Sequence, residues 1–304
     1  MIPLSEATAL VTGGAGFIGG HLARTLCERG ATVRVLDDFS TGARERVPDD
    51  ATVIDGDVRD DSVVEEAMRG VDVVFHEAAI VSVERSVDEP ETTHAVNVDA
   101  TLGVLETARE ADARVVFASS AAIYGAPETV PIDESTPKEP SSPYGLEKLA
   151  ADHYCRLYAD LYGVETVALR YFNVYGPGQR GGPYSGVITK FVEQARAGGP
   201  ITVQGDGTQT RDFVHVSDIV RANLAAATTE RTGTAYNAGT GRAVEIRELA
   251  ALIRDRVAPD ADIVYGDART GDIRASVAAV SKAAEELGFE AETSLADGLD
   301  DLLG

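Results

Sequence analysis

The stretch SSPYGLEKLAADHY at residues 141–154 contains a tyrosine, Tyr144, four positions before a lysine, Lys148. On a helix this spacing places both side chains on one face, where an ammonium group would favour an ionised phenol that could act as a base. Ser142 and Pro143 suit the N-cap and the first helical position, which predicts a helix that begins just before Tyr144. With four lysines and ten tyrosines in the chain, such a pair arises by chance with a probability of roughly one in eight. A catalytic interpretation therefore needs support from other motifs.

A second candidate site is the glycine-rich segment LVTGGAGFIGGHL, in which Gly13, Gly16 and Gly19 have the spacing G-x-x-G-x-x-G. It follows a predicted strand and opens a predicted helix. This context favours a dinucleotide site, in which the glycines provide a tight turn, close approach of the backbone to a pyrophosphate, and packing of helix on strand. The free N–H groups at the helix N-terminus would then face the phosphates. A simple glycine turn is the alternative.

Asp37 ends the second predicted strand, about 20 residues after the glycines. Its carboxylate could accept hydrogen bonds from the adenosine ribose and would repel a 2′-phosphate, which favours NAD over NADP. Two alternatives stay open: Asp37 caps the DDFSTG turn, or Arg44 holds the extra phosphate of NADP. Asp57, after the third strand, could meet the adenine amino group or be an ordinary turn residue.

These residues need a framework to position them, and strand-like and helix-like segments alternate through the first half of the chain. Strands that are apolar on both faces and joined by helices predict a parallel sheet covered on both sides, the doubly wound α/β fold of the Rossmann type. The predicted strands are 7–12, 32–37, 51–54, 71–76, 114–119 and 166–170, and the predicted helices are 17–29, 61–69, 92–111 and 144–162.

The segment YFNVYGPGQRGGPYSG at 171–186 interrupts this alternation, and its glycines and prolines predict an irregular passage. We interpret residues 1–172 as the dinucleotide-binding domain and 173–304 mainly as a second, smaller α/β domain for the substrate. Part of 205–230 is a candidate to return to the first domain. After the irregular passage, strands are expected near 201–203, 212–216 and 235–238, and helices near 187–197, 217–228, 246–257 and 281–287.

Fifty acidic and 27 basic residues give the chain a formal charge of −23, distributed along the sequence. This charge argues against binding to nucleic acid. Together with the scarcity of lysine it is typical of a surface adapted to high salt, where screening reduces the repulsion between like charges. Neither a basic leader nor a run of about 18 apolar residues is found, so we expect a soluble, cytoplasmic protein without membrane attachment.

The cysteines and histidines predict no further chemistry. Cys27 and Cys155 lie far apart in apolar stretches, and we expect both to be small core residues rather than a disulfide. The five histidines are scattered without the spacing of ligands, so no metal site is expected.

Six motifs, taken in order, carry a resemblance to a known family: TGGAGFIG, DDFSTG, FHEAA, SSAAIYG, YGLEK and LRYFNVYGPGQ. From about residue 7 to residue 290 the chain resembles the extended short-chain dehydrogenase/reductases, most closely the NAD-dependent nucleotide-sugar 4-epimerases of the UDP-glucose 4-epimerase type. Together the motifs are specific for the superfamily and less specific for the substrate. The resemblance implies a nucleotide-sugar substrate, and a homodimer formed through the helices at 92–111 and 144–162.

By this resemblance Tyr144 is the base, Lys148 lowers its pKa, and Ser120 bonds the same substrate hydroxyl. A phenol with a pKa of about 10 must be brought near neutrality, a shift of roughly three units. The cationic ring of oxidised NAD and the helix N-terminus would act in the same direction as Lys148. Ser119 is the competing serine, but the hydroxyl of the family lies four residues before the tyrosine of IYG, which selects Ser120.

The resemblance assigns further residues to the two ligands. Phe172 would lie against the nicotinamide, and Asn173, Arg211 and Arg269 would contact the nucleotide diphosphate, with a solvated surface pair as the alternative for each arginine. Ser276 would either line the sugar pocket or face solvent. The assigned NAD-binding residues are Gly13, Gly16, Phe17, Ile18, Gly19, Asp37, Asp38, Ser40, Thr41, Gly42, Asp57, Val58, Ala78, Ala79, Asn97, Tyr144, Lys148 and Phe172. The assigned substrate-binding residues are Ser120, Tyr144, Asn173, Val187, Arg211, Arg269 and Ser276.

Ala121 and Ala122, which follow Ser120, bear on the reaction. Relatives that dehydrate nucleotide sugars carry an Asp-Glu pair there, and related decarboxylases carry a glutamate, because those reactions need another proton donor or acceptor. Alanine supplies neither, which favours 4-epimerisation of a UDP-glucose or UDP-galactose type of substrate, plain or N-acetylated, through a 4-keto intermediate. Many 4-epimerases have threonine where Ala122 stands, so a dehydratase, decarboxylase or reductase of the family stays an alternative, as does a noncatalytic NAD-sensing protein.

Overall fold

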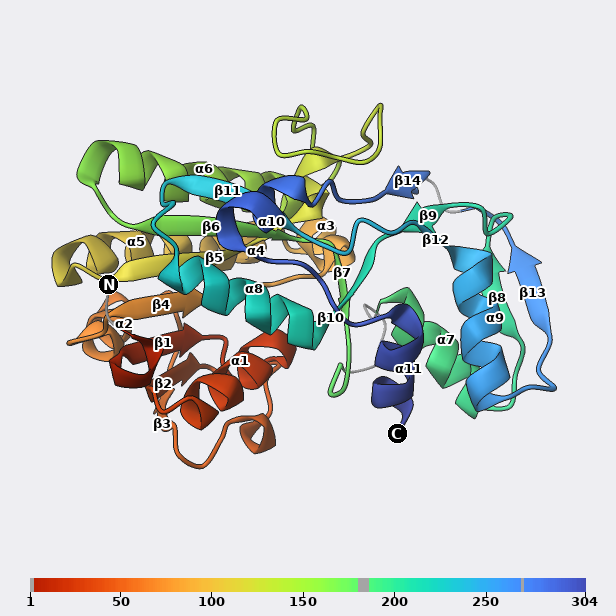
Figure 1. Ribbon diagram of the computed structural model, residues 1–304, viewed down its shortest axis with the longest axis horizontal. Helices are drawn as coiled ribbons and strands as arrows, with labels where there is room; N and C mark the ends of the chain where they lie inside the picture. The colour runs from red at the N-terminus through yellow and green to blue at the C-terminus, as the bar shows by residue number, and fades with distance from the viewer. Residues whose placement is uncertain (1–2, 180–185, 269–270) are drawn as a thin grey trace.

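The computed structural model describes residues 3–179, 186–268 and 271–304. These residues form a larger and a smaller region side by side (Figure 1). The larger region contains the N-terminal half of the chain. The smaller region, on the right of Figure 1, contains α7 (Val187–Arg196), α9 (Ile246–Val257), β8 (Ile201–Gln204) and β13 (Ile263–Gly266).

The larger region is built on a sheet whose described strands all run parallel, in the order β11-β6-β5-β4-β1-β2-β3. Every residue of β4 and β6 is buried, as expected for strands covered on both faces. The order reverses between β1 and β4, which is the position where doubly wound sheets bind ligands. The predicted doubly wound fold is thus confirmed. The strands are β1 (Thr8–Thr12), β2 (Thr32–Asp37), β3 (Thr52–Asp55), β4 (Val73–His76), β5 (Arg114–Ser120), β6 (Thr166–Tyr171) and β11 (Thr234–Ala238).

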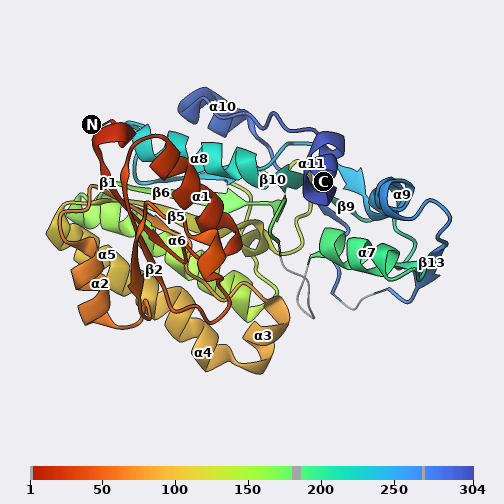
Figure 2. The ribbon, with the colours of Figure 1, turned by 90° about the horizontal axis from the view of Figure 1, so that it is seen from below.

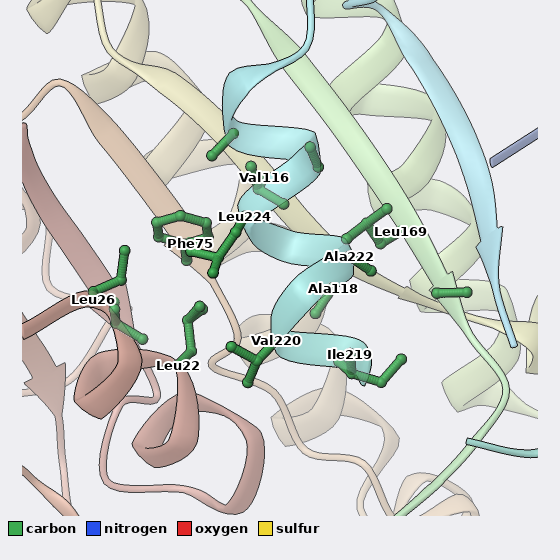
Figure 3. Packing of buried hydrophobic residues seen from close by; sticks show 14 of the residues in the cluster. Leu22, Leu26, Phe75, Val116, Ala118, Leu169, Ile219, Val220, Ala222 and Leu224 are labelled. Atoms are coloured by element: carbon green, nitrogen blue, oxygen red, sulfur yellow. The ribbon is translucent and has the colours of Figure 1, made fainter. Parts of the chain in front are cut away.

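Helices cover both faces of this sheet (Figure 2). On one face, Leu22 of α1 and Leu224 of α8 belong to the same buried cluster as Phe75 and Leu169 of the strands (Figure 3). On the other face, α2, α5 and α6 bury a second cluster that includes Cys155. Both cysteines are free thiols. The helices are α1 (Phe17–Glu28), α2 (Asp61–Met68), α5 (Ala100–Ala111), α6 (Pro143–Tyr162) and α8 (Val216–Thr228).

Helix α6 carries the tyrosine and lysine of the first motif, and its ends follow local rules. The Ser142 hydroxyl accepts a hydrogen bond from the Gly145 N–H at 3.1 Å, and Pro143 occupies the first turn. At the other end Gly163 takes a left-handed conformation with φ of +72°, which glycine adopts without steric cost. The cap therefore fixes where the helix begins relative to Tyr144.

The helix expected at 92–111 is interrupted. The chain forms α4 (Pro90–His94), a π-helical turn at Ala95–Asp99, and then α5, and a separate short helix α3 (Val83–Asp88) precedes them. In the π turn the amide group of Asn97 donates to the Ile80 carbonyl at 3.0 Å and accepts from the Ile80 N–H at 2.9 Å. Such turns often mark functional sites, and apolar spacing alone could not reveal this one.

The smaller region has its own core, in which Phe191, Ile201 and Leu249 are buried. Its strands are short, and several lie outside the sequence prediction. β9 lies between β12 and β14, while β8 pairs with β13. The elements are α7 (Val187–Arg196), β8 (Ile201–Gln204), β9 (Thr210–Arg211), β12 (Val244–Glu245), α9 (Ile246–Val257), β13 (Ile263–Gly266), β14 (Ala275–Ser276) and α11 (Leu295–Leu303).

The chain crosses between the two regions more than once. β7 (Asn173–Tyr175) pairs in parallel with β10 (Phe213–His215), and α8 follows β10 directly. β11 then joins the large sheet beside β6, and α10 (Ser281–Leu287) packs near β11. Residues 234–238 follow the irregular passage, which predicts that they belong to the second domain. The pairing of β11 with β6 instead places them in the first sheet.

Candidate active site

The glycine-rich turn lies at the carboxyl end of β1 and has little room for side chains. Gly13 has a φ of +67°, and a Cβ there would lie 2.7 Å from the backbone nitrogen of Ala78. A Cβ on Gly19 would overlap the carbonyl oxygen of Gly13. Gly16 is the N-cap of α1 and provides no side-chain cap. The turn therefore presents the start of the helix to a ligand, as a pyrophosphate site requires.

A cavity of about 520 Å³ extends from this turn across the ends of β2, β3 and β4. It brings together Gly13, Gly16, Asp37, Asp38, Ser40, Thr41, Asp57, Val58, Ala78 and Ala79 of the residues predicted to bind NAD. Phe17, Ile18, Gly19, Gly42, Asn97, Tyr144, Lys148 and Phe172 are not part of its lining.

Asp37 lies at the end of β2 with its carboxylate held by backbone amides. Oδ2 accepts from the Ala15 N–H and Oδ1 from the Phe39 N–H, both at 2.9 Å. Burial raises the pKa of the carboxyl, while these two hydrogen bonds oppose the rise. Arg44 stacks over the Phe39 ring at 5.3 Å. The carboxylate is thus fixed at the position expected for a ribose-binding group.

Asp57 also has a local partner. Its carboxylate accepts from Nε of Arg59 at 3.0 Å and from the Arg59 backbone N–H at 2.9 Å, and the Arg59 side chain holds its pKa below the usual value. Asp57 therefore acts as a turn residue, which is one of the two roles that the sequence allowed. Contact with adenine stays a prediction.

The catalytic candidates meet where β5 ends and α6 begins. Ser120 is the last residue of β5, and its hydroxyl accepts a hydrogen bond from the Ala122 N–H at 3.1 Å. Tyr144 is buried, with 9% of its surface exposed, and a hydrogen bond from Ser120 opposes the rise in its pKa. Ser119 instead donates to Asp152 at 3.0 Å in the core. The structure therefore brings Ser120, and not Ser119, to Tyr144.

Electrostatics at Tyr144 differ from the sequence expectation. Burial is the largest influence and raises the pKa of the phenol, Glu147 raises it further, and Lys148 is not among the groups that shift it. Burial and Glu147 therefore outweigh the hydrogen bond from Ser120, and the pKa of the phenol lies above its usual value. The lowering expected from the sequence would need the positive charge of the oxidised nicotinamide ring.

Lys148 is buried one helical turn after Tyr144 in α6. Its Nζ donates to the Ala118 carbonyl at 2.8 Å and lies 4.9 Å from the centre of the Phe117 ring. Burial lowers the pKa of Lys148 to about 8, and the charge of Glu77 is the largest influence in the opposite direction. Glu77 was not identified from the sequence as a site residue, because its only signal was its place in FHEAA.

Two other predicted NAD contacts have protein partners. Asn97 donates to the Ile80 carbonyl and to Glu147, so its amide positions the loop that follows β4. Phe172 is buried in a cluster with Ile123. Contact of either residue with NAD stays a prediction.

A second cavity, of about 250 Å³, lies in the smaller region. Three predicted substrate residues, Asn173, Val187 and Arg211, line it. The Arg211 guanidinium donates to Asp272, and burial lowers its pKa. The other lining residues are Lys190, Phe191, Gln194, Thr202, Gln204, Gln209, Ile246 and Asp272.

Ser276 lies on β14 and is paired with Arg211 of β9. This pairing places it near the second cavity, although it is not part of the lining. Arg269 lies outside the described residues. The polar lining residues of this cavity were missed by sequence reasoning because they come from separate short elements without a shared motif.

The described residues show neither a candidate metal site nor a helix that could span a membrane. No group of three or more His, Cys, Asp or Glu side chains could hold a metal ion. No helix in the described ranges is long and apolar enough to cross a membrane.

The glycine turn, the fixed Asp37 and the Ser-Tyr-Lys group define a nicotinamide-dinucleotide enzyme of the short-chain type. Comparison with known proteins identifies the family. Residues 9–239 match the model of the NAD dependent epimerase/dehydratase family. The chain belongs to this family, and its cofactor is NAD.

Several relatives cover nearly the whole chain. A putative UDP-glucose 4-epimerase of Methanocaldococcus jannaschii is 38% identical over 293 residues, 95% of each chain. The structure of a UDP-glucose 4-epimerase of Thermotoga maritima with UDP-glucose has a TM-score of 0.94 and 36% identity, covering 97% of each chain. A UDP-N-acetylglucosamine 4-epimerase of Methanobrevibacter ruminantium has a TM-score of 0.92 and 34% identity over 98% of each chain. A UDP-N-acetyl-alpha-D-glucosaminuronate decarboxylase of Bacillus cytotoxicus is 36% identical over 84% of this chain and 82% of its own.

Proposed function

We propose that this protein is a nucleotide-sugar 4-epimerase that acts on UDP-glucose and UDP-galactose or their N-acetylated counterparts. The observation that carries the proposal is that Ser120 is hydrogen-bonded to Tyr144, while the buried Lys148 donates to the Ala118 carbonyl of the same strand. The 4-epimerases among its relatives support the same conclusion.

The side chains next to Ser120 favour epimerisation over the other reactions of the family. Ala121 and Ala122 form the turn that follows β5, and the N–H of Ala122 is bound to the Ser120 hydroxyl. Their methyl groups can neither donate nor accept a proton. Dehydration or decarboxylation would need such a group. This chain therefore lacks, at this turn, the acidic side chains that the family resemblance assigns to dehydratases and decarboxylases.

In the proposed mechanism Tyr144, as phenolate, accepts the proton of the sugar 4-hydroxyl, and Ser120 orients that hydroxyl. The oxidation at C4 and the reduction of the 4-keto sugar on its opposite face would be the chemistry that bound NAD supplies. Tyr144 then gives the proton back to the new 4-hydroxyl, so no proton or electron is consumed overall. The buried position of Tyr144 limits access of water to the reacting oxygen.

We infer that the second cavity holds the nucleotide diphosphate while the keto sugar turns. Arg211 could exchange Asp272 for phosphate oxygens, because a guanidinium suits both kinds of anion. Asn173 lines the same cavity and starts β7, which follows β6 directly. Binding of the diphosphate in the smaller region would leave the sugar free to rotate next to Tyr144.

The test is to incubate the purified protein with a panel of UDP-, dTDP- and GDP-hexoses in molar salt, without added cofactor, and to identify 4-epimers by NMR. Interconversion of at least one pair supports the proposal. Release of water or carbon dioxide instead of a 4-epimer would assign another family reaction, and no turnover of any sugar by protein that retains NAD would favour a sensing role.

We also propose a homodimer through α6. Leu146, Leu157 and Leu161 lie along this helix with 59%, 46% and 61% of their surfaces exposed, and their spacing places them on one side of it. A second copy would remove these side chains from water. Light scattering of the wild type and of Leu157→Glu should show a dimer and a monomer; a monomeric wild type would exclude the interface.

A further inference from the structure

Glu77 is a partly buried acid that the proposed mechanism does not use. It follows β4 and lines the NAD cavity. Its Oε1 accepts a hydrogen bond from the Tyr171 hydroxyl at 2.7 Å, and that hydroxyl accepts from Nδ2 of Asn223 on α8 at 2.7 Å. The carboxyl group is therefore held in place by residues of two neighbouring elements, β6 and α8. The proposed mechanism assigns no proton transfer to it.

The strand register brings Glu77 to the same edge of the sheet as Lys148. β4 and β5 pair His76 with Phe117, so Glu77 and Ala118 are the next neighbours along the two strands. The Ala118 carbonyl accepts the hydrogen bond from Nζ of Lys148 at 2.8 Å. The carboxyl and the ammonium thus approach this edge from opposite faces of the sheet, and the lysine side chain is buried.

The other titratable groups that face Lys148 cannot take the place of Glu77. His76 is held neutral, because burial lowers its pKa to about 3. Burial raises the pKa of the Cys155 thiol, which keeps it neutral as well. Glu147 influences Lys148 less than Glu77 does, and its carboxylate is bound to Asn97.

We propose that Glu77 is the counter-ion of Lys148, a positioning residue that keeps the ammonium group charged beside the catalytic tyrosine. The effect on turnover rests on the proposed function, whereas the effect on Lys148 does not. An unpaired ammonium in such a site would lose its proton readily, since burial disfavours the charged form.

The direction of the effect follows from the two groups. Burial raises the pKa of Glu77 to about 7 and lowers that of Lys148 to about 8, so both are ionised between these values. In the E77Q variant the amide can still accept the Tyr171 hydrogen bond but carries no charge. The pKa of Lys148 should therefore fall, by about one unit, the lower end for loss of a nearby opposite charge.

The chain offers a direct measurement because it has only four lysines, Lys138, Lys148, Lys190 and Lys282. The NAD-bound protein is labelled with [13Cε]lysine and titrated by NMR, and the Lys148 signal is assigned with Lys148→Arg. E77Q should lower the pKa of this signal alone. Glu66→Gln, on the exposed side of α2, removes one charge elsewhere and should move none of the four signals.

A second readout separates this role from a merely structural one. If Lys148 must be charged for turnover, the alkaline limb of the kcat/KM profile should move down with the Lys148 pKa in E77Q and stay in place in E66Q. Should E77Q fail to fold, Tyr171→Phe removes the donor that lowers the Glu77 pKa, and the Lys148 signal should shift in the same direction by less.

An unchanged Lys148 pKa in a folded E77Q, or in Tyr171→Phe when E77Q does not fold, overturns the proposal even if the protein is an active epimerase. A wild type that turns over no sugar, but shows the expected shift in Lys148, contradicts the proposed function and leaves the counter-ion role supported.

Discussion

Tyr144 is the residue on which the proposed chemistry depends. Tyr144→Phe should keep the fold and the bound NAD, because the ring is already buried and only the hydroxyl at Ser120 is lost. Turnover should fall by at least about 100-fold, the lower end for loss of a positioned general base. Released NAD and the rate of 4-epimer formation measure the two effects.

The matched control is Tyr154→Phe on the same helix, which should retain full activity. Tyr154 packs against the second core of the sheet, away from Ser120. If Tyr144→Phe stays within a few-fold of the wild type, Tyr144 is not the base.

Ser276 bears on which sugars are accepted. Its pairing with Arg211 places it next to the proposed diphosphate site, and if it faces the sugar, as the family resemblance predicts, its small side chain would leave room for an acetamide group. Ser276→Tyr should abolish turnover of the UDP-N-acetylhexosamines and spare UDP-glucose and UDP-galactose, because the ring would overlap only the larger group. Parallel assays on both substrate types give the result.

A tyrosine in place of exposed Ser281, at the start of α10, serves as the control and should affect neither substrate type. Equal loss on both substrate types in Ser276→Tyr, or loss on neither, would show that Ser276 does not determine sugar size.

His76 makes folding sensitive to acid. It is fully buried between Thr12 and Thr101, with hydrogen bonds of 2.7 and 3.0 Å, and burial lowers its pKa to about 3. Because the unfolded chain takes up a proton near pH 6.5 and the folded one does not, the unfolding free energy falls as the pH drops from 6.5 toward 3, by about 1.4 kcal/mol per unit.

His76→Gln should therefore flatten the pH dependence of unfolding by denaturant between pH 6.5 and 4.5, whatever its effect at neutral pH. His94→Gln, at an exposed position, is the matched control. Equal slopes for wild type and His76→Gln would contradict a neutral buried histidine.

The π turn is anchored to the loop after β4 by the side chain of Asn97. Asn97→Ala would leave the N–H and carbonyl of Ile80 without these partners in the loop after β4. We expect a loss of about 2 kcal/mol in unfolding free energy and weaker retention of NAD, because this loop lines the cofactor cavity.

Unfolding by denaturant and equilibrium dialysis of NAD measure both effects. Thr107→Ala, whose hydroxyl bonds the Gly103 carbonyl within α5, is the control and should be nearly neutral. A variant at Asn97 with wild-type stability and NAD affinity would mean that the π turn holds its shape without this side chain.

Long buried elements could be predicted from the sequence, while short paired ones could not. The strand at Thr32–Asp37 and the helix at Ile246–Val257 agree with the predicted bounds, because their apolar patterns are long and local. β9, β12 and β14 have two residues each, so only partners distant in sequence define them. Helix α11 was also missed.

The same distinction holds for the site. The glycine turn and the Tyr144–Lys148 pair are local motifs and could be predicted from spacing. Glu77 and Asp272 gain their partners, Tyr171 and Arg211, only through folding, and no local pattern signals such contacts.

The two regions contribute different parts of the proposed reaction. Ser120, Tyr144 and Lys148 belong to the large sheet and its helix, whereas Arg211 belongs to the smaller region. Asp212 joins the crossing segments, since its buried carboxylate accepts from the Thr240, Gly241 and Ala278 amides at 2.8 to 3.1 Å. A substrate that contacts both Tyr144 and Arg211 would therefore span two regions that the hydrogen bonds of Asp212 already connect.

The charge of −23 acts on the whole molecule rather than at one site. Acidic side chains outnumber basic ones almost two to one, so many carboxylates remain near others of the same sign even where arginines pair with them. In dilute buffer this repulsion opposes the compact state, whereas at about 1 M salt the screening length falls to about 3 Å. We propose on this ground that the protein is adapted to high salt.

The melting temperature should accordingly rise markedly between dilute buffer and molar sodium chloride, and scanning calorimetry on the NAD-bound protein would measure it. Sucrose stabilises by exclusion from the surface without screening charge, so it should not reproduce the steep rise at low salt. Replacing exposed Asp49 and Asp50 by asparagine removes two neighbouring charges and should reduce the salt dependence, because less repulsion is left to screen. A melting temperature that stays level or falls as salt is added would contradict the adaptation, since repulsion of this origin must weaken when counter-ions are supplied.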